Sequence, residues 1–287
     1  MDCRTLVDAE ALKARLGTAG LRVFDCRCSP TDPEAGTRAY REGHLPGARH
    51  ADLDRVLSSP PGSTTGRHPL PDRGALAKWL AEEGVGADIC IVAYDDAGGA
   101  FAARLWWLAR WLGHPAAAVL DGGLRAWKAA GGTLEQGEVG PPRPARFPVR
   151  GPLVETLEAA QVLEIVNGRR AGRLVDARAS GRYRGEADPI DTVAGHIPGA
   201  ANLPFAGNIG ADGRFRSPAE LRRRFAAVLE RPGEAVHYCG SGVTACHNML
   251  AMEQAGLAGS RLYPGSWSEW IRDPERPISR GDDNDDE

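Results

Sequence analysis

The stretch Gly195-His196-Ile197-Pro198-Gly199-Ala200 occurs twice in this chain, because residues 43–48 read Gly-His-Leu-Pro-Gly-Ala. Working outward, apolar runs flank each copy in the same order, at 21–25 and 89–94 in the first half and at 173–176 and 235–238 in the second. Features that recur in a fixed order indicate an internal repeat. The chain is therefore expected to contain two copies of one structural unit.

The apolar runs themselves predict the fold class. They are short, rich in β-branched residues and lack strict alternation, and helical stretches such as 101–111 and 243–255 follow them. This pattern is typical of a buried, largely parallel sheet covered by helices. Ser217-Pro218-Ala219-Glu220 adds a helix start with a capping box. We predict an α/β fold with two similar domains, each a mostly parallel sheet flanked by helices.

Gly and Pro residues between Gly131 and Pro152 would interrupt any regular element and predict an interdomain linker. The predicted division is a first domain over 1–132, a linker over 133–151 and a second domain over 152–280. Residues 281–287 form an acidic run that has nothing to bury, and we expect a disordered tail.

Composition excludes several classes of protein. With 287 residues the chain is long enough for two ordinary domains, and its net charge of −3 gives no electrostatic reason to expect nucleic acid. No apolar run is long enough to cross a bilayer and no secretory signal follows Met1, so we expect a cytoplasmic protein without a membrane partner. The six cysteines are then expected to remain thiols.

Cys239 stands at the first position of a loop between an apolar strand and a helix. The loop reads Cys239-Gly240-Ser241-Gly242-Val243-Thr244. Its two glycines allow successive backbone N–H groups to point inward, and the following helix adds partial positive charge at the same place. Such a cradle stabilises a thiolate, so Cys239 is predicted to be a nucleophile.

The other cysteines give weaker signals. Cys26 and Cys28 form a C-x-C pair without a second pair, and Cys246 and His247 lie in the helix after the loop. Neither spacing supports metal ligation, so we predict no metal site.

A cysteine phosphatase also uses a strand, a Cys loop and a helix, and it is a competing class of enzyme. Such an enzyme needs an Arg six positions after the Cys to hold the phosphate, but that position is Ala245. The phosphatase reading is therefore disfavoured.

With these residues in place, the chain resembles the tandem-domain rhodanese-like sulfurtransferases from about Leu6 to Arg280. The resemblance is carried by the two Gly-His-Leu/Ile-Pro-Gly-Ala motifs, the Cys239 loop and the closing Gly265-Ser266-Trp267-Ser268-Glu269-Trp270. It implies an inactive first copy and a catalytic second copy. In agreement, Asp95 follows Tyr94 where Cys239 follows Tyr238.

The resemblance also implies a sulfur donor. Thiosulfate enzymes of the family place basic residues directly after the cysteine, whereas this loop looks like the 3-mercaptopyruvate branch. The loop residues that the resemblance implies in contact with the donor are Gly240, Gly242, Val243 and Thr244. Arg182 matches the family's first substrate-binding arginine. The second has no equivalent, because the aligned stretch reads Asp188-Pro189-Ile190-Asp191, and Arg184 is a substitute candidate.

Mercaptopyruvate enzymes of this family are further proposed to use a Ser-His-Asp relay. The matching positions are Ser241, His68 and Asp54, with His68 supplied by the first half of the chain. The expected role is to polarise the donor once the histidine orients the serine.

The predicted function is transfer of sulfur from 3-mercaptopyruvate, through a Cys239 persulfide, to cyanide or to a thiol such as thioredoxin or glutathione, with release of pyruvate and without a cofactor. Two alternatives stay open at this point: a thiosulfate sulfurtransferase that releases sulfite, and a non-catalytic persulfide carrier or interaction module.

Overall fold

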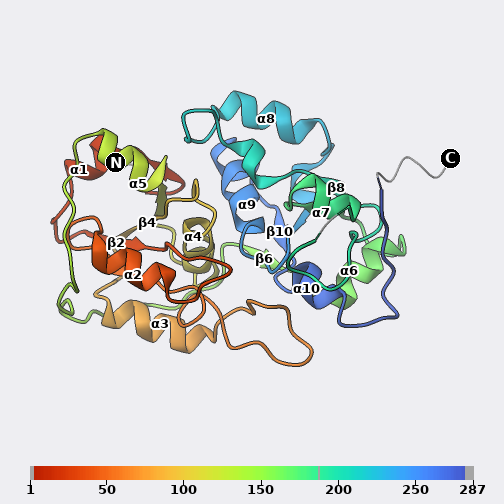
Figure 1. The fold of residues 1–287 in the computed structure, drawn as a ribbon, viewed down its shortest axis with the longest axis horizontal. Coiled ribbons are helices and arrows are strands. Elements are labelled where there is room, and N and C mark those ends of the chain that lie inside the picture. The colour runs from red at the N-terminus through yellow and green to blue at the C-terminus, as the bar shows by residue number, and fades with distance from the viewer. Residues whose placement is uncertain (1–2, 187, 282–287) are drawn as a thin grey trace. The chain divides into compact units, whose positions relative to one another are not determined.

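The computed structural model describes residues 3–186 and 188–281, which form two compact units (Figure 1). The first unit runs up to Ser59, continues over Leu70–Leu153 and includes Ala211–Phe215. The second comprises Pro60–Pro69, Val154–Gly210 and the chain from Arg216 onward. The predicted tail lies outside the described residues, apart from Gly281.

Strands and helices alternate along the first unit. Its elements are β1 (Leu6–Val7), α1 (Ala9–Lys13), β2 (Leu21–Asp25), α2 (Ala35–Glu42), β3 (Arg49–His50), α3 (Arg73–Glu82), β4 (Cys90–Tyr94), α4 (Ala102–Trp111), β5 (Ala117–Leu120) and α5 (Gly123–Ala129).

The second unit repeats this alternation. Its elements are β6 (Glu155–Thr156), α6 (Ala159–Val166), β7 (Arg173–Asp176), α7 (Ser180–Arg184), β8 (Ala201–Asn202), the 3₁₀ turn η1 (Phe205–Asn208), α8 (Pro218–Ala226), the 3₁₀ turn η2 (Pro232–Glu234), β9 (Ala235–Tyr238), α9 (Ala245–Gln254), β10 (Arg261–Leu262) and α10 (Ser266–Trp270). The predicted cap of α8 is present, with Ser217 and Glu220 forming a capping box.

Each unit is built on one parallel sheet. The strand order is β1-β5-β4-β2-β3 in the first and β6-β10-β9-β7-β8 in the second, which is the same order in both. In the second unit Asp176 pairs with Tyr238, as Asp25 pairs with Tyr94 in the first. The predicted α/β fold with two parallel sheets is confirmed.

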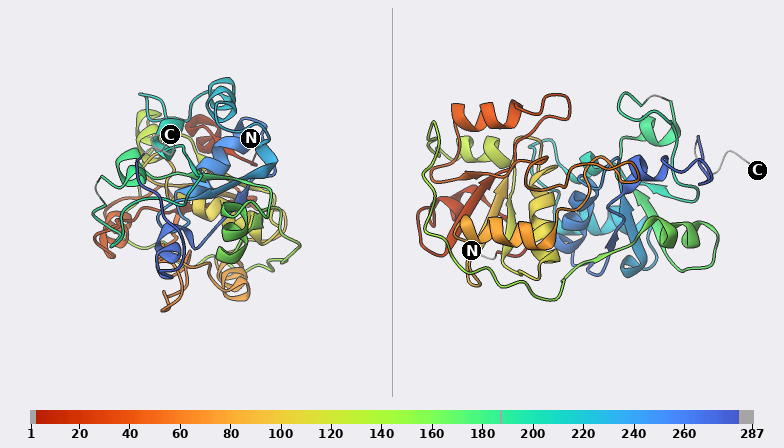
Figure 2. Two further views of the ribbon diagram at one scale, coloured as in Figure 1. Left: turned by 90° about the vertical axis from the view of Figure 1, so that its right-hand side faces the viewer. Right: turned by 90° about the horizontal axis from the view of Figure 1, so that it is seen from below.

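Helices cover both faces of each sheet, as the views of Figure 2 show. In the second unit Val236 and Tyr238 join a buried cluster with Trp267 and Trp270 of α10, while α9 packs against β9 and α8. Tyr238 and Trp267 are fully buried and belong to the core. Since parallel strands end at one sheet edge, Cys239 directly after β9 lies where ligands of such sheets bind.

In the second unit, the Gly-His motif packs against residues of the unit's own interior. His196 stacks on Tyr183 at 3.7 Å between ring centroids, and the Tyr183 hydroxyl donates to the Ala200 carbonyl at 2.7 Å. Arg178, bound to the Asp176 carboxylate, also donates to the Gly195 carbonyl at 2.7 Å. The motif therefore ties the helix that precedes it to the central strands and forms no part of the Cys239 loop.

One expectation about the cysteines is wrong. Cys3 and Cys90 form a disulfide bond within the first unit, which joins the segment before β1 to the start of β4. Strand β4 is central in its sheet, so the bond brings together residues that are 87 positions apart in sequence. Cys26, Cys28, Cys239 and Cys246 are free thiols.

Candidate functional site

The Cys239 side chain is enclosed by its own loop. Cys239 is 2% exposed, and the Gly242 N–H donates to its Sγ atom at 3.1 Å. Gly242 has φ of +79°, and a Cβ there would lie 2.3 Å from the Pro264 carbonyl oxygen, so no other residue fits without a shift of the backbone. The loop conformation that aims an amide at the sulfur therefore depends on this glycine.

Hydrogen bonds to the first residues of α10 fix the backbone of the Cys239 loop. The Cys239 N–H donates to Ser266 Oγ at 3.1 Å, while the N–H groups of Trp267 and Ser268 donate to the carbonyls of Cys239 and Gly240 at 3.0 and 2.9 Å. Ser266 has φ of +55° and, among the described residues, is the one non-glycine residue with positive φ. These bonds fix the backbone on both sides of the nucleophile.

Two members of the predicted relay lie in contact. The His68 Nδ1 atom is 2.7 Å from Ser241 Oγ. His68 belongs to Pro60–Pro69, which is part of the second unit, whereas the predicted boundaries assigned it to the first domain. Gly66, two residues before His68, lies so close to Gly265 that a Cβ on Gly66 would be 2.4 Å from the Gly265 carbonyl oxygen. The Pro60–Pro69 segment therefore packs against the first residues of α10.

Asp54, the third member, belongs to the first unit. Burial, reinforced by the nearby Asp52 carboxylate, raises the pKa of Asp54 above its ordinary value. The role of Asp54 stays a prediction.

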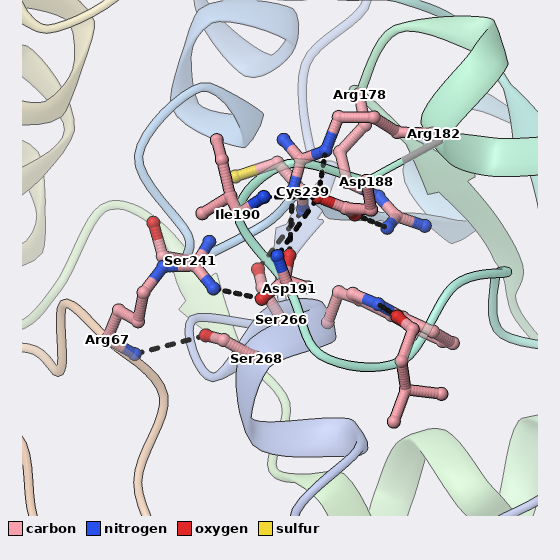
Figure 3. A network of polar contacts seen from close by, with 12 residues as sticks. Arg67, Arg178, Arg182, Asp188, Ile190, Asp191, Cys239, Ser241, Ser266 and Ser268 are labelled. Carbon is pink, nitrogen blue, oxygen red and sulfur yellow. Dashed lines mark hydrogen bonds and ion pairs between the residues drawn. The ribbon is translucent and has the colours of Figure 1, made fainter. Parts of the chain in front are cut away.

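Arg182 is part of a network of ion pairs beside the loop (Figure 3). Its Nε lies 3.0 Å from Asp188 Oδ1, and its Nη2 donates to Asp191 Oδ2 at 2.7 Å. The same Nη2 atom is 3.3 Å from the position that a Cβ on Gly240 would take. Arg182 thus presents a guanidinium to the residue that follows the nucleophile. Donor binding by Arg182 stays a prediction.

Arg184 is placed differently. Its Nε donates to Glu186 Oε1 at 2.5 Å, and about a third of its side chain is exposed. This ion pair gives Arg184, the last residue of α7, a carboxylate partner two positions later in the chain. Donor binding by Arg184 stays a prediction.

Sequence analysis missed Arg67. Its Nη2 lies 2.8 Å from the position of a Cβ on Gly240, its Nη1 pairs with Asp191, and its backbone N–H donates to Ser268 Oγ at 3.0 Å. Figure 3 shows it reaching toward Asp191 from the Pro60–Pro69 segment. The second substrate arginine was expected near residues 188–191, whereas Arg67 directly precedes His68 in the sequence. That adjacency to a predicted site residue was the available signal.

Gly240 allows both guanidinium groups to approach the loop, because a side chain at this position would collide with Arg67. Val243 is buried, and Thr244 is the N-cap residue of α9. Among the hydrogen bonds of the described residues, the amide that donates to Cys239 Sγ is that of Gly242. Direct donor contacts by Gly240, Val243 and Thr244 stay predictions.

Asp188 anchors the network to the core of the second unit. Its Oδ2 lies 3.5 Å from Arg178 Nη1, and Arg178 stacks over the Trp267 ring at 4.8 Å. Burial acts to raise the pKa of Asp188, but hydrogen bonds from the amides of Asp191 and Ile190 and from Arg182 outweigh it and lower that pKa. Asp188 is therefore held as a carboxylate.

The equivalent loop of the first unit is filled by Asp95. Its buried carboxylate accepts four backbone N–H groups, from Ala97, Gly99, Phe101 and Ala102, at 2.8 to 2.9 Å. Burial nevertheless raises the pKa of Asp95, although these hydrogen bonds oppose it. The loop amides that a second thiolate would need are thus used by a side chain that cannot carry sulfur.

The remaining free cysteines have no predicted role in the reaction. Burial raises the pKa of both the Cys26 and the Cys28 thiols. Cys246 is fully buried in α9 and donates to the Gly242 carbonyl at 3.3 Å.

Within residues 3–186 and 188–281, no three His, Cys, Asp or Glu side chains are grouped so as to hold a metal ion. In the same residues, no helix is long and apolar enough to span a membrane.

Comparisons with known proteins identify relatives along the whole repeat. The model of the rhodanese-like domain matches residues 8–130 and again residues 158–273. A probable 3-mercaptopyruvate sulfurtransferase of Pseudomonas aeruginosa is 51% identical over 98% of this chain and 100% of its own length. A putative thiosulfate sulfurtransferase of Mycobacterium tuberculosis is 39% identical over 90% of each chain.

Solved structures agree with these relatives. The 3-mercaptopyruvate sulfurtransferase from Leishmania major superposes with a TM-score of 0.84 and 33% sequence identity, over 94% of this chain and 75% of that one.

Proposed function

The chain belongs to the rhodanese-like family, and from this premise we propose that it is a sulfurtransferase with 3-mercaptopyruvate as its preferred donor. The observation that carries the proposal is the enclosed Cys239 thiol, which accepts a hydrogen bond from the Gly242 N–H and lies next to a glycine approached by two arginines. Amide donors and cations around a sulfur stabilise its anionic form, which is the form that attacks another sulfur.

The first half-reaction forms a persulfide. The Cys239 thiolate attacks the donor sulfur, and a new S–S bond forms while the C–S bond of mercaptopyruvate breaks. The electron pair of that bond passes to carbon, giving the enolate of pyruvate, which takes up a proton and leaves as pyruvate. Arg67 and Arg182 hold the donor carboxylate, since a guanidinium matches a carboxylate in charge and geometry.

Ser241 and His68 act on the carbonyl of the donor. A hydroxyl held by an imidazole can donate toward the oxygen on which charge develops as the enolate forms. The contact of 2.7 Å between Ser241 Oγ and His68 Nδ1 supports this role.

The second half-reaction passes the sulfur on. The thiolate of an acceptor attacks the outer sulfur of the persulfide, a new S–S bond forms on the acceptor, and Cys239 leaves as a thiolate. The proposed acceptors are thioredoxin or glutathione in a cytoplasmic setting, with cyanide as an assay acceptor. Ping-pong kinetics should result.

The two units divide the work in this proposal. The first unit performs no sulfur transfer because Asp95 fills its loop. The second unit, which includes Arg67 and His68 of Pro60–Pro69, carries the reaction.

Thiosulfate is the second candidate donor. The relative from Mycobacterium tuberculosis favours it by name. The loop residues Gly240, Ser241, Gly242, Val243 and Thr244 provide no cation of their own, and this favours the singly charged carboxylate of mercaptopyruvate over the dianion.

A side-by-side assay tests the proposal. We expect kcat/KM to be higher for mercaptopyruvate than for thiosulfate, and Cys239→Ser to abolish both reactions. A higher kcat/KM for thiosulfate would reverse the donor assignment. Turnover by the Cys239→Ser variant would contradict the assignment of the nucleophile, and loading of sulfur without turnover on any small acceptor would indicate a carrier.

A further inference from the structure

Asp191 bridges the two arginines of the site. Its Oδ1 accepts a hydrogen bond from Nη1 of Arg67, and its Oδ2 accepts one from Nη2 of Arg182 at 2.7 Å. The Asp191 side chain is 2% exposed, whereas those of Arg67 and Arg182 are 30% and 19% exposed. Each carboxylate oxygen thus serves a different guanidinium, and water reaches the cations more readily than the anion between them.

Both arginines are positioned by this bridge next to the nucleophile. Their Nη2 atoms lie 2.8 and 3.3 Å from the position that a Cβ on Gly240 would take, one residue after Cys239. An anionic donor whose sulfur reaches Cys239 therefore meets these two guanidinium groups while Asp191 still binds them.

The charges of the described network balance. Its cations are Arg67, Arg178 and Arg182, and its anions are Asp176, Asp188 and Asp191. Without Asp191 the network would hold one more cation than anion. An uncompensated cation attracts a doubly charged donor about twice as strongly as a singly charged one at the same distance.

We propose that Asp191 is a positioning and specificity-determining residue, which aligns Arg67 and Arg182 and offsets one of their charges so that the site prefers a singly charged donor to a dianion. This inference rests on the proposed function and deepens it by naming the residue that sets donor charge. The carboxylate stands in the stretch Asp188-Pro189-Ile190-Asp191, where sequence analysis found an anchor missing.

Asp191→Asn tests the inference, because it removes the charge and keeps the shape. The ratio of kcat/KM for thiosulfate to kcat/KM for mercaptopyruvate should rise by about tenfold, and the rise should shrink as ionic strength increases. Asp191→Glu keeps the charge and should keep a ratio near that of the parent protein. Arg67→Gln removes a positive charge from the network and should lower the ratio of kcat/KM for thiosulfate to kcat/KM for mercaptopyruvate.

Glu234→Gln is the matched control. Glu234 is a carboxylate of the same unit that pairs with Arg231 at 2.8 Å, and it directly precedes Ala235 at the opposite end of β9 from Cys239. This variant should leave the donor ratio unchanged.

The outcomes separate the two claims. If the parent protein turns over neither donor, the proposed function fails. If it turns over at least one, but Asp191→Asn and Arg67→Gln both leave the ratio unchanged or reduce both reactions alike, Asp191 is only a structural residue and the inference is overturned. If Asp191→Asn does not fold, Arg67→Gln decides. A lower ratio of kcat/KM for thiosulfate to kcat/KM for mercaptopyruvate supports the inference. An unchanged ratio, or equal losses with both donors, overturns it.

Discussion

The Oγ atom of Ser241 lies 2.7 Å from Nδ1 of His68, although 173 positions separate the two residues in sequence. Ser241 is two residues after the nucleophile, and His68 is brought to it by a segment seated on the start of α10. The contact therefore joins the nucleophile loop to a side chain that no local pattern places there.

Removing this contact should damage one reaction selectively. Ser241→Ala and His68→Ala are each expected to lower kcat for mercaptopyruvate by about 100-fold, since the carbonyl loses its polarising group. Thiosulfate releases sulfite without forming an enolate, so its turnover should change little. Measuring kcat and KM for both donors checks this, and an equal loss with both donors would argue against the role.

Gly242→Ala should disable the nucleophile loop. A Cβ at Gly242 would lie 2.3 Å from the Pro264 carbonyl oxygen, so the loop must shift and the amide that donates to Cys239 Sγ must move. We expect at least about a tenfold loss of kcat/KM with either donor.

Gly199→Ala is the control for backbone strain. Gly199 also has a positive φ, of +72°, but nothing lies within 4 Å of the added Cβ. This variant should lose about 1 kcal/mol of stability and keep its activity. Equal activity losses in the Gly199 and Gly242 variants would assign the effect to general strain.

Reduction of the Cys3–Cys90 disulfide should destabilise the first unit. The bond spans 87 positions, and closing a loop of that length removes enough entropy from the unfolded chain to contribute about 4 to 5 kcal/mol. Unfolding followed with and without dithiothreitol should show a lower Tm for the reduced protein.

Two cysteine variants make this test specific. Cys3→Ser should be insensitive to the reductant, and Cys28→Ser, which changes a free thiol, should respond as the parent does. A parent protein whose Tm ignores the reductant would contradict the stabilising role of the bond.

His237 should make the fold sensitive to acid. Burial lowers the pKa of His237 to about 3, below its ordinary value of 6.5. Between these values the unfolded chain binds the proton and the folded one does not, so stability is full above pH 6.5 and is lost as pH falls toward 3.

The expected slope from this group is up to about 1.4 kcal/mol per pH unit within that window. His237→Leu should reduce the slope in urea unfolding measured from pH 7 to pH 4 and change it little above pH 7. Identical slopes in parent and variant would show that other groups control the acid response.

The sheets were predictable because their signal is local. The strands at Leu21–Asp25, Arg173–Asp176 and Ala235–Tyr238 have the predicted bounds, since buried parallel strands are continuous apolar runs bordered by polar residues. The loop between β9 and α9 followed from two glycines beside a cysteine.

The rest of the site depends on contacts between residues far apart in sequence. Arg67 reaches Asp191 across 124 positions, and the residues between them contain no pattern that indicates the pairing. The Cys3–Cys90 bond is hidden for the same reason, since neither cysteine has a distinctive neighbourhood in sequence. Assignment of Pro60–Pro69 to the second unit likewise follows from tertiary packing.

The most direct test of the central claim is the mass of the protein after incubation with mercaptopyruvate without an acceptor. The account predicts one adduct of about 32 Da, located by peptide mapping on Cys239 and removed by a thiol. An unmodified Cys239, or an adduct on Cys28 or Cys246 instead, would contradict it.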